Sequence, residues 1–134
     1  MDILKKLYEE ALNYPGVIGL IIGTRPDCID EDKLTYLMEL SQRCYLAVEY
    51  GIESCYNKTL KRINRGHSFE DAVWAVERTS ALGINTGAHF IFGLPGETRE
   101  EMVNQVAVIS ELPLKTVKFH QLQIIKGTTM EKEF

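Results

Sequence analysis

Residues able to do chemistry stand within or just after the apolar segments of this sequence. The clearest examples are Arg25, Glu53, His89 and His120. An ionised carboxylate only accepts hydrogen bonds, a guanidinium only donates them, and an imidazole can do both. In parallel α/β folds, ligand sites form where the carboxyl ends of the strands meet. The placement therefore predicts a site for a polar ligand at one end of a parallel sheet.

Alternation along the apolar segments strengthens that prediction. Residues two apart in a strand share a face, which groups Glu49 with Gly51 and Glu53. The same rule groups further polar and glycine residues in the later segments, namely Asn85, Gly87, His89 and Gly93, and Lys118 with His120. A packed barrel interior is filled by bulky branched residues, so a face of Glu, His and Gly indicates room for a ligand. The alternative, an exposed face of an antiparallel sheet, is disfavoured by the helical connections.

The elements that would position these residues alternate between helical and strand periodicity. Strands are expected over residues 17–22, 44–52, 84–92 and 116–125. Helices are expected over residues 2–13, from Asp30, over 55–63, from Ser68 to Gly83 and from Thr98 to Pro113, with a loop over 23–27 and a frayed end over the last nine residues. Strands separated by helices pair in parallel through right-handed crossovers. The expected fold class is therefore α/β, with four parallel strands alternating with helices.

Local signals refine these elements. Asp30 is a helix cap, and Ser68 with Asp71 and Thr98 with Glu101 have the spacing of capping boxes. The continuous apolar run 17–22 is typical of a strand that is buried on both faces. Four parallel strands cannot close a barrel, so the first and last strands should have open edges.

Composition bounds the class of protein. The chain has 134 residues, 45% hydrophobic and 25% charged, which suits one ordinary globular domain. Its net charge of −4 argues against broad electrostatic binding of nucleic acid. No apolar run approaches the roughly 20 residues that span a membrane, and the first residues lack the apolar core of a signal peptide, so we expect a cytoplasmic protein without a membrane partner.

Several of these features have simpler explanations when taken one at a time. The stretch 93–96 could be only a Pro-Gly turn, and it is neither a dinucleotide fingerprint nor a P-loop. Arg65 could be a solvated side chain near a helix end, and a lone His67 or His120 is more often structural than a ligand. Cys28, Cys44 and Cys55 are 16 and 11 positions apart, which fits neither a disulfide framework nor a compact metal motif.

Taken in order, four stretches resemble the radical S-adenosylmethionine superfamily. They are GTRPDC (23–28), EYGIES (49–54), LKRINRGH (60–67) and HFIFGLPGE (89–97). Within the superfamily they are similar to the branch of oxygen-independent coproporphyrinogen oxidases and elongator-type proteins, and most of all to uncharacterised bacterial iron–sulfur oxidoreductases. The resemblance covers roughly residues 16 to 125.

The resemblance implies a partial TIM-type barrel of six β/α units, of which this chain would supply strands three to six. Residues 1–134 would then be a fragment of one catalytic barrel domain that lacks the Cys-x-x-x-Cys-x-x-Cys loop, since none of the three cysteines forms that motif. The cofactors implied are S-adenosylmethionine and, in the parent protein, a 4Fe–4S cluster. Reductive cleavage would give a 5′-deoxyadenosyl radical that abstracts hydrogen from an unknown small-molecule or RNA substrate.

The resemblance also implies roles for individual residues. Glu53 matches the residue that bonds the ribose hydroxyls, and Arg65 the arginine that pairs with the methionine carboxylate. Gly93 and Gly96 match the loop beside the adenine, His89 stands where relatives carry a cofactor contact, and Arg25 would face cofactor or substrate. No residue of this chain is expected to ligate metal or to be catalytic.

Two other functions remain open from the sequence. The first is a non-catalytic truncated scaffold that self-associates as a homo-oligomer through its open sheet edges. The second is an unrelated α/β enzyme that binds a phosphorylated substrate at the glycine-rich turn, although no basic phosphate-binding motif supports it. In the radical-enzyme interpretation, this chain alone is expected to be inactive.

Overall fold

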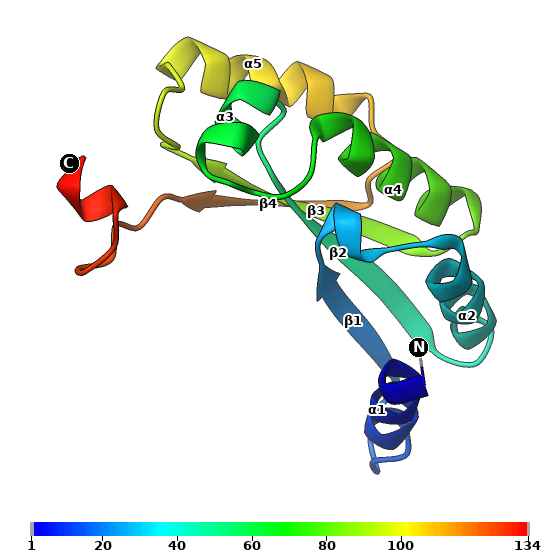
Figure 1. Cartoon of the computed structure of the whole chain (residues 1–134). Helices are drawn as coiled ribbons and strands as arrows, with labels where there is room; N and C mark the ends of the chain where they lie inside the picture. Colours follow the sequence, from blue (N-terminus) through cyan, green and yellow to red (C-terminus); the bar gives the residue numbers. More distant parts are fainter. Residues whose placement is uncertain (1, 134) are drawn as a thin grey trace.

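The protein is an open, twisted parallel sheet with helices along one face (Figure 1). The computed structural model describes residues 2–133. Each strand pairs in parallel with the strand that precedes it, so the spatial order equals the chain order: β1 (Gly19–Thr24), β2 (Tyr45–Glu53), β3 (Asn85–Phe92) and β4 (Thr116–Gln121). The predicted α/β class with four parallel strands is confirmed.

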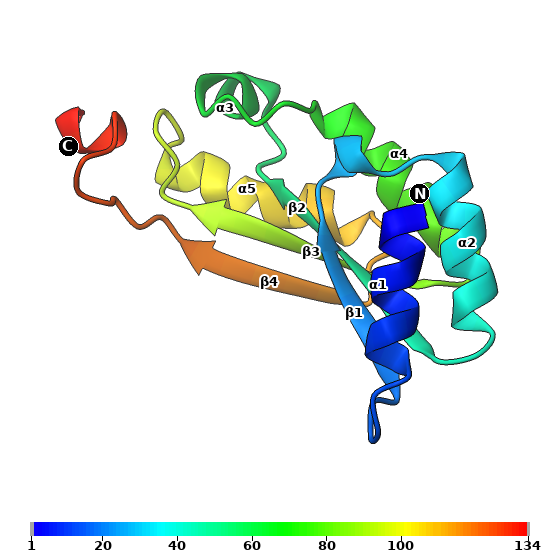
Figure 2. The ribbon, with the colours of Figure 1, turned by 60° about the horizontal axis from the view of Figure 1, so that its bottom comes forward.

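The helices leave one face of the sheet bare. They are α1 (Asp2–Leu12), α2 (Glu31–Ser41), α3 (Asn57–Arg62), α4 (Phe69–Ala81) and α5 (Arg99–Ser110), with short 3-10 helices η1 (Pro26–Cys28) and η2 (Met130–Lys132). Figure 2 shows α3, α4 and α5 on the same side of the sheet, while α1 lies along β1. Within residues 2–133, the opposite face of the sheet carries no helix.

The predicted caps are present. The Asp30 side chain accepts a hydrogen bond from the backbone nitrogen of Lys33 at 2.9 Å. Ser68 with Asp71 starts α4, and Thr98 with Glu101 starts α5, each as a complete capping box in which side chain and backbone bond reciprocally. These bonds satisfy backbone donors that the first turn of a helix leaves free, and they fix where each helix begins.

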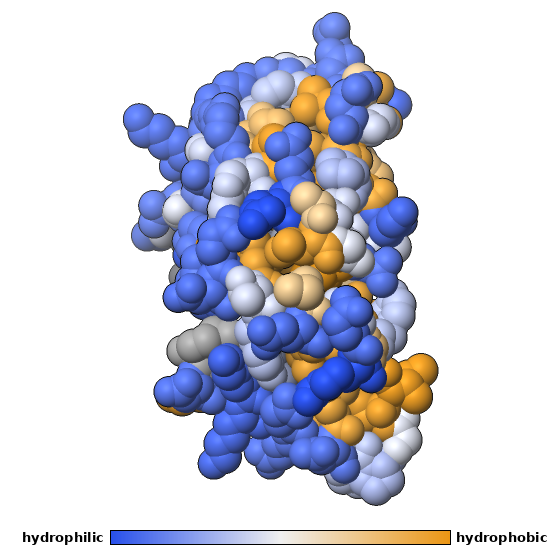
Figure 3. Space-filling model, turned by 90° about the vertical axis from the view of Figure 1, so that its right-hand side faces the viewer, coloured by the Kyte–Doolittle hydropathy of each residue, from blue (hydrophilic) through white to orange (hydrophobic). Residues whose placement is uncertain are grey.

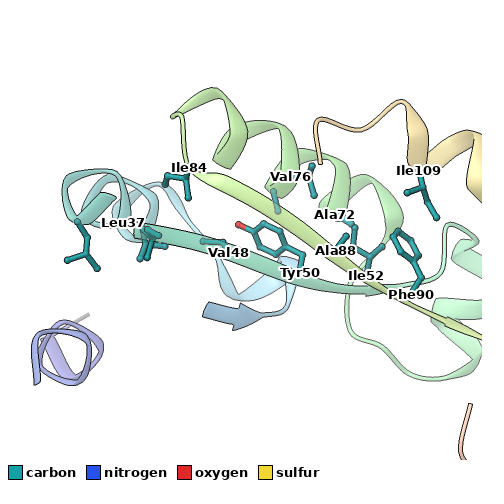
Figure 4. Close-up of a cluster of buried hydrophobic side chains, with 13 residues drawn as sticks. Leu37, Val48, Tyr50, Ile52, Ala72, Val76, Ile84, Ala88, Phe90 and Ile109 are labelled. Atoms are coloured by element: carbon teal, nitrogen blue, oxygen red, sulfur yellow. The ribbon is translucent and has the colours of Figure 1, made fainter. Parts of the chain in front are cut away.

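The hydrophobic core lies between the sheet and its helices. β2 and β3 contribute fully buried Tyr50 and Phe90, and α4 contributes Ala72 and Val76 (Figure 4). Tyr50 is the only large polar side chain drawn in this cluster, and its hydroxyl lies 2.7 Å from the hydroxyl oxygen of buried Thr79. Because the apolar residues of each central strand point to this side, the alternate residues must point to the bare face.

The first strand corrects one prediction. The run 17–22 was expected to be a strand buried on both faces, but β1 begins at Gly19, and Ile18 and Ile21 are 84% and 62% exposed. The backbone of residues 14–17 forms a turn instead, in which Val17 N donates to Tyr14 O. Leu20 and Ile22 pack against the core, so Ile21 points to the bare face of the sheet, which no helix within residues 2–133 covers.

The last strand is shorter than predicted. The strand expected over 116–125 ends at Gln121, because its partner β3 ends at Phe92 and the last bond runs from Leu122 N to Phe92 O. Every residue of β4 is exposed. The predicted loop 23–27 contains most of η1, and the last nine residues contain η2, whose Glu131 side chain accepts from Gly127 N at 2.6 Å.

Apolar side chains also reach the surface in patches between hydrophilic residues (Figure 3). On α1, Ile3 and Leu7 are 77% and 54% exposed, whereas Tyr8 and Leu12 pack against the core. The apolar side chains of the helix predicted over residues 2–13 are thus only partly buried within the chain. Among residues 2–133, no helix has the length and apolar character needed to cross a bilayer.

Candidate functional site

Glu53 ends β2 in an unusual backbone conformation. Its φ is 72°, which places a non-glycine residue in the left-handed region. The register with β3 shifts at the same place, since Gly51 lies opposite His89 but Glu53 lies opposite Phe90. Such irregularities re-aim side chains, and they cluster at functional sites because surrounding structure must hold them. The bulge thus presents the Glu53 carboxylate at the carboxyl end of the sheet.

Arg65 reaches this carboxylate from the loop between α3 and α4. Its Nη2 lies 3.0 Å from Glu53 Oε1 and donates a hydrogen bond to Gly51 O at 2.7 Å. The side chains of Glu53 and Arg65 are only 14% and 23% exposed. The two residues that sequence reasoning singled out for one cofactor are therefore brought together, as a partly shielded ion pair.

Gly51 makes room for that pair. A Cβ at this position would lie 2.5 Å from Arg65 Nη2 and 2.7 Å from Glu53 Oε1, which is closer than real contacts allow. Arg65 Nε is buried and has no hydrogen-bond partner in residues 2–133. The site thus combines a carboxylate acceptor, a guanidinium with an unused donor and a backbone without a side chain. This donor set suits a ligand that carries both hydroxyl groups and a carboxylate.

Two further residues of the same region have structural partners. His67 is buried, with Nε2 3.3 Å from Gly51 O and Nδ1 3.0 Å from Ser68 O. Arg25 is exposed and forms an ion pair with Asp27, to which its Nε donates at 3.0 Å. A Cβ on Gly66 would lie 3.7 Å from Arg25 Nη2, so Arg25 lies beside the loop that carries Arg65, but it is not a member of the Glu53–Arg65 pair.

Gly93 and Gly96 shape the turn that follows β3. Both have a φ of 89°, which favours glycine, and neither would bring a Cβ closer than ordinary contact. Glycine is thus favoured at these two positions by the backbone conformation, whereas at Gly51 it is favoured because a side chain would clash with its neighbours. Gly93 N also lies 3.1 Å from the sulfur of Met102 in α5. This contact holds the turn at the carboxyl end of the sheet, next to the start of α5.

A buried polar network, which sequence reasoning missed, fixes this turn to the end of β2. Glu97 accepts hydrogen bonds from the hydroxyl of Ser54 and from Gln105 Nε2 at 3.3 Å. Gln105 Oε1 in turn accepts from the backbone nitrogen of Cys55 at 2.8 Å. Ser54 and Gln105 are fully buried. The only sequence signal was Glu97 at the end of the glycine stretch, since nothing local marks Gln105 as inward-facing.

His89 belongs to a second cluster on the bare face. Its Nε2 lies 2.9 Å from Glu49 Oε2, and its Nδ1 lies 3.2 Å from Nε2 of His120. Lys118 Nζ lies 2.7 Å and 2.9 Å from the two Glu49 oxygens. Hydrogen bonding from Lys118 lowers the pKa of Glu49 most, burial opposes this, and His89 lowers the pKa further. Alternation placed these residues on one face but gave Glu49 and Lys118 no role.

The cysteines do not form a centre in the part of the chain that the structure describes. Cys28, Cys44 and Cys55 are all free thiols. Burial, with a smaller contribution from Glu97, raises the pKa of Cys55 to about 12, so its thiol stays protonated at neutral pH. No group of three or more His, Cys, Asp or Glu residues within residues 2–133 could hold a metal ion.

Comparison with known proteins places this geometry in a family. The profile of the Radical SAM superfamily matches residues 1–107. An uncharacterised protein of Methanocaldococcus jannaschii is 39% identical over 132 residues, covering 98% of this chain and 41% of that protein. The uncharacterised protein YtqA of Bacillus subtilis is 37% identical over 134 residues, covering 100% of this chain and 42% of YtqA. The chain thus spans about two fifths of the length of these relatives.

More distant matches confirm the predicted branch and fold. The oxygen-independent coproporphyrinogen-III oxidase-like protein HemZ of Bacillus subtilis is 28% identical over 138 residues, covering 98% of this chain and 26% of HemZ. The solved structure of Elp3 from Methanocaldococcus infernus superimposes with a TM-score of 0.75 at 30% identity, over 86% of this chain and 27% of that one. The methyltransferase TsrM of Kitasatospora setae shares the fold, with a TM-score of 0.74 at 24% identity over 98% of this chain and 26% of TsrM.

Proposed function

The chain belongs to the radical S-adenosylmethionine superfamily, and we propose that it supplies the strand ends that hold S-adenosylmethionine in an iron–sulfur oxidoreductase. The observation that carries the proposal is the ion pair of Glu53 and Arg65, seated over the bare backbone of Gly51. An acceptor and a donor at the carboxyl ends of parallel strands form the kind of site that this fold uses for ligands.

Each residue has a part that follows from its chemistry. Glu53 accepts hydrogen bonds from the two ribose hydroxyls, because a carboxylate is acceptor-only and has two oxygens. Arg65 donates to the methionine carboxylate, and its Nε, which has no partner in residues 2–133, is available for that bond. The turn with Gly93 and Gly96 lies against the adenine. When bound, the cofactor and a reduced 4Fe–4S cluster supply a radical that abstracts hydrogen from the substrate.

His89 and Arg25 take positions at the margin of the same site. His89 lies opposite Gly51 in the pairing of β2 with β3, and from there it would contact the cofactor. Arg25, which is paired with Asp27, would contact cofactor or substrate. Of the two substrate classes, a small molecule suits the net charge of −4 better than an RNA does.

The binding part of the proposal is testable on this chain. Isothermal titration with S-adenosylmethionine is compared for the native chain and for the Glu53→Gln and Arg65→Lys variants. Each variant should bind roughly tenfold more weakly, the loss expected for one charge-assisted hydrogen bond. Glu31→Gln is the matched control, since it removes a surface carboxylate paired with Arg78. Equal affinity of all four proteins would refute the assigned site.

The cluster part requires a ligand set from elsewhere in the parent protein. We propose that residues 1–134 form barrel strands three to six of a six-unit domain, and that the chain alone is inactive. The coding sequence upstream of Met1 decides this point. A Cys-x-x-x-Cys-x-x-Cys run about 100 residues upstream, the length of two β/α units, is the expected finding. Without such a run, the enzymatic proposal fails for this protein.

The exposed edge strand supports a second candidate function, a scaffold that associates with copies of itself. All residues of β4 are exposed, including Val117 at 36% and Phe119 at 47%. Such an edge offers unpaired backbone groups to another strand. Sedimentation of the native chain and of Phe119→Lys tests it. A dimer that the substitution dissociates favours the scaffold, whereas a monomer at all concentrations excludes it.

A further inference from the structure

Three side chains linked by hydrogen bonds cross the bare face of the sheet, from β2 through β3 to β4. Glu49 Oε2 lies 2.9 Å from His89 Nε2, and His89 Nδ1 lies 3.2 Å from His120 Nε2. The two rings are 5.1 Å apart and tilted by 36°. Glu49 and His89 are 12% and 29% exposed, and His120 at the edge is exposed. These three side chains thus form a path from the shielded carboxylate of Glu49 outward to the accessible imidazole of His120.

The positions of the protons follow from the partners. An ionised carboxylate can only accept, so His89 must carry its proton on Nε2. His89 Nδ1 then has a free lone pair, and His120 must donate to it from Nε2. The remaining nitrogen, His120 Nδ1, is therefore an acceptor, and it has no hydrogen bond to any residue of 2–133. A carboxylate that orients an imidazole in this way also stabilises the imidazolium that forms when the ring gains a proton.

We propose that Glu49, His89 and His120 form a proton relay that serves a ligand with an acidic N–H or O–H group on the bare face. His120 Nδ1 takes the proton from the ligand, and the proton on His120 Nε2 moves to His89 Nδ1. One proton leaves the ligand, one imidazolium forms at His89, and no electron is transferred. The reverse sequence delivers a proton. The relay goes beyond the proposed function, because it requires neither the cofactor nor the cluster.

The charges around the relay keep Glu49 ionised. The groups facing it are Glu49 from β2, Lys118 from β4 and, beyond Gly51, the pair of Glu53 and Arg65. β1 contributes none, since Gly23 lies opposite Glu49. Lys118 lowers the pKa of Glu49, so the carboxylate stays ionised and the proton remains on the imidazoles. The negative charge of Glu49 is thereby available to the His89 imidazolium.

Nuclear magnetic resonance of the 134-residue chain with 15N-labelled histidine tests the relay directly. The chain has three histidines, so each ring can be assigned, and His67 serves as the internal reference. With both rings neutral, we expect His89 and His120 to be protonated at Nε2. A scalar coupling between His120 Nε2 and His89 Nδ1 should report the hydrogen bond that joins them.

Variants separate a relay from a chance contact. Glu49→Leu should abolish the single tautomer of His89 and the coupling between the rings, whereas Lys118→Met should preserve both. If Glu49→Leu does not fold, His89→Phe replaces it, and His120 should then lose its fixed tautomer. A proton on Nδ1 of either ring in the native chain, or no coupling between the rings, overturns the proposal. Since no S-adenosylmethionine is present, this result is independent of cofactor binding.

Discussion

Glu53 and Arg65 lie 3.0 Å apart, joined through the same Nη2 that donates to Gly51 O. One nitrogen therefore ties the loop before α4 to the bulged end of β2. The pair is formed within the chain itself, so the carboxylate and guanidinium are already oriented before any ligand arrives. Preorganisation of this kind lowers the entropy that binding must overcome.

Replacing Gly51 with alanine should disrupt the pair without removing either charge. The new Cβ would lie 2.5 Å from Arg65 Nη2, so the guanidinium must move. Because the clashing atoms are the ends of two flexible side chains, we expect only a small loss of stability but weaker S-adenosylmethionine binding. Urea unfolding and isothermal titration measure the two effects. Gly23→Ala is the control, since a Cβ there meets nothing within 4 Å, and equal effects of both changes would contradict the steric argument.

Replacing Gln105 with leucine should loosen the turn that follows β3. The change leaves the backbone nitrogen of Cys55 and one Glu97 oxygen without their partner in a buried region. An unpaired buried polar group costs about 1–3 kcal/mol, so the free energy of unfolding should fall by at least that amount. Asn104→Leu, on the exposed side of the same helix, should change stability far less. Identical melting temperatures for the two variants would rule out the network's role.

Cys28 and Cys55 should react with a thiol reagent at very different rates. Cys28 is exposed, whereas burial raises the pKa of Cys55 to about 12. Because the thiolate is the reactive form, Cys55 should be modified only when the chain unfolds. Mass spectrometry after brief labelling at neutral pH checks the order, and labelling in denaturant should reach all three thiols. Early modification of Cys55 in the native chain would contradict the prediction, because it would show that the reagent reaches the end of β2 in the folded state.

Alkaline pH should destabilise the protein through Tyr50. Burial raises its pKa from 10.0 to about 12, with a smaller opposing effect of Thr79. The unfolded chain therefore releases this proton at lower pH than the folded chain, and stability present below pH 10 is lost as pH rises towards 12. Tyr50→Phe should flatten this fall, but it should cost about 1–3 kcal/mol at neutral pH by leaving the Thr79 hydroxyl unpaired.

The control for the alkaline experiment is Tyr14→Phe, because Tyr14 is 73% exposed. Its unfolding free energy should follow that of the native chain at every pH. Cys55 adds to the alkaline loss above pH 9.0 in all of these proteins, so only the difference between variants reports on Tyr50. A Tyr50→Phe curve parallel to the native one would disprove the assignment.

Local signals in the sequence predicted the fold well where they were dense. The capping boxes at Ser68 and Thr98 and the apolar alternation of β2 and β3 gave correct elements, because these features are decided within a few residues. The predictions for 17–22 and 116–125 were less accurate. An edge strand ends where its partner ends, and that depends on pairing between distant segments rather than on composition.

The same distinction applies to the site. Strand-end position identified Glu53, and the family resemblance identified Arg65, but their contact depends on a bulge at the end of β2 that no residue type announces. Gln105 was missed because its role arises only when α5 folds back over Cys55. The relay residues were placed on one face by alternation, yet Glu49 had no assigned role until the neighbours contributed by β3 and β4 were known.

The sequential order of the strands has a consequence for synthesis on the ribosome. Because each strand pairs with the one before it, the sheet grows from β1 to β4 in the order in which the chain emerges. No later segment must insert between two strands that are already joined, so each β/α unit can dock as soon as it is complete. Contacts of this kind keep contact order low for a parallel sheet, and low contact order favours rapid folding.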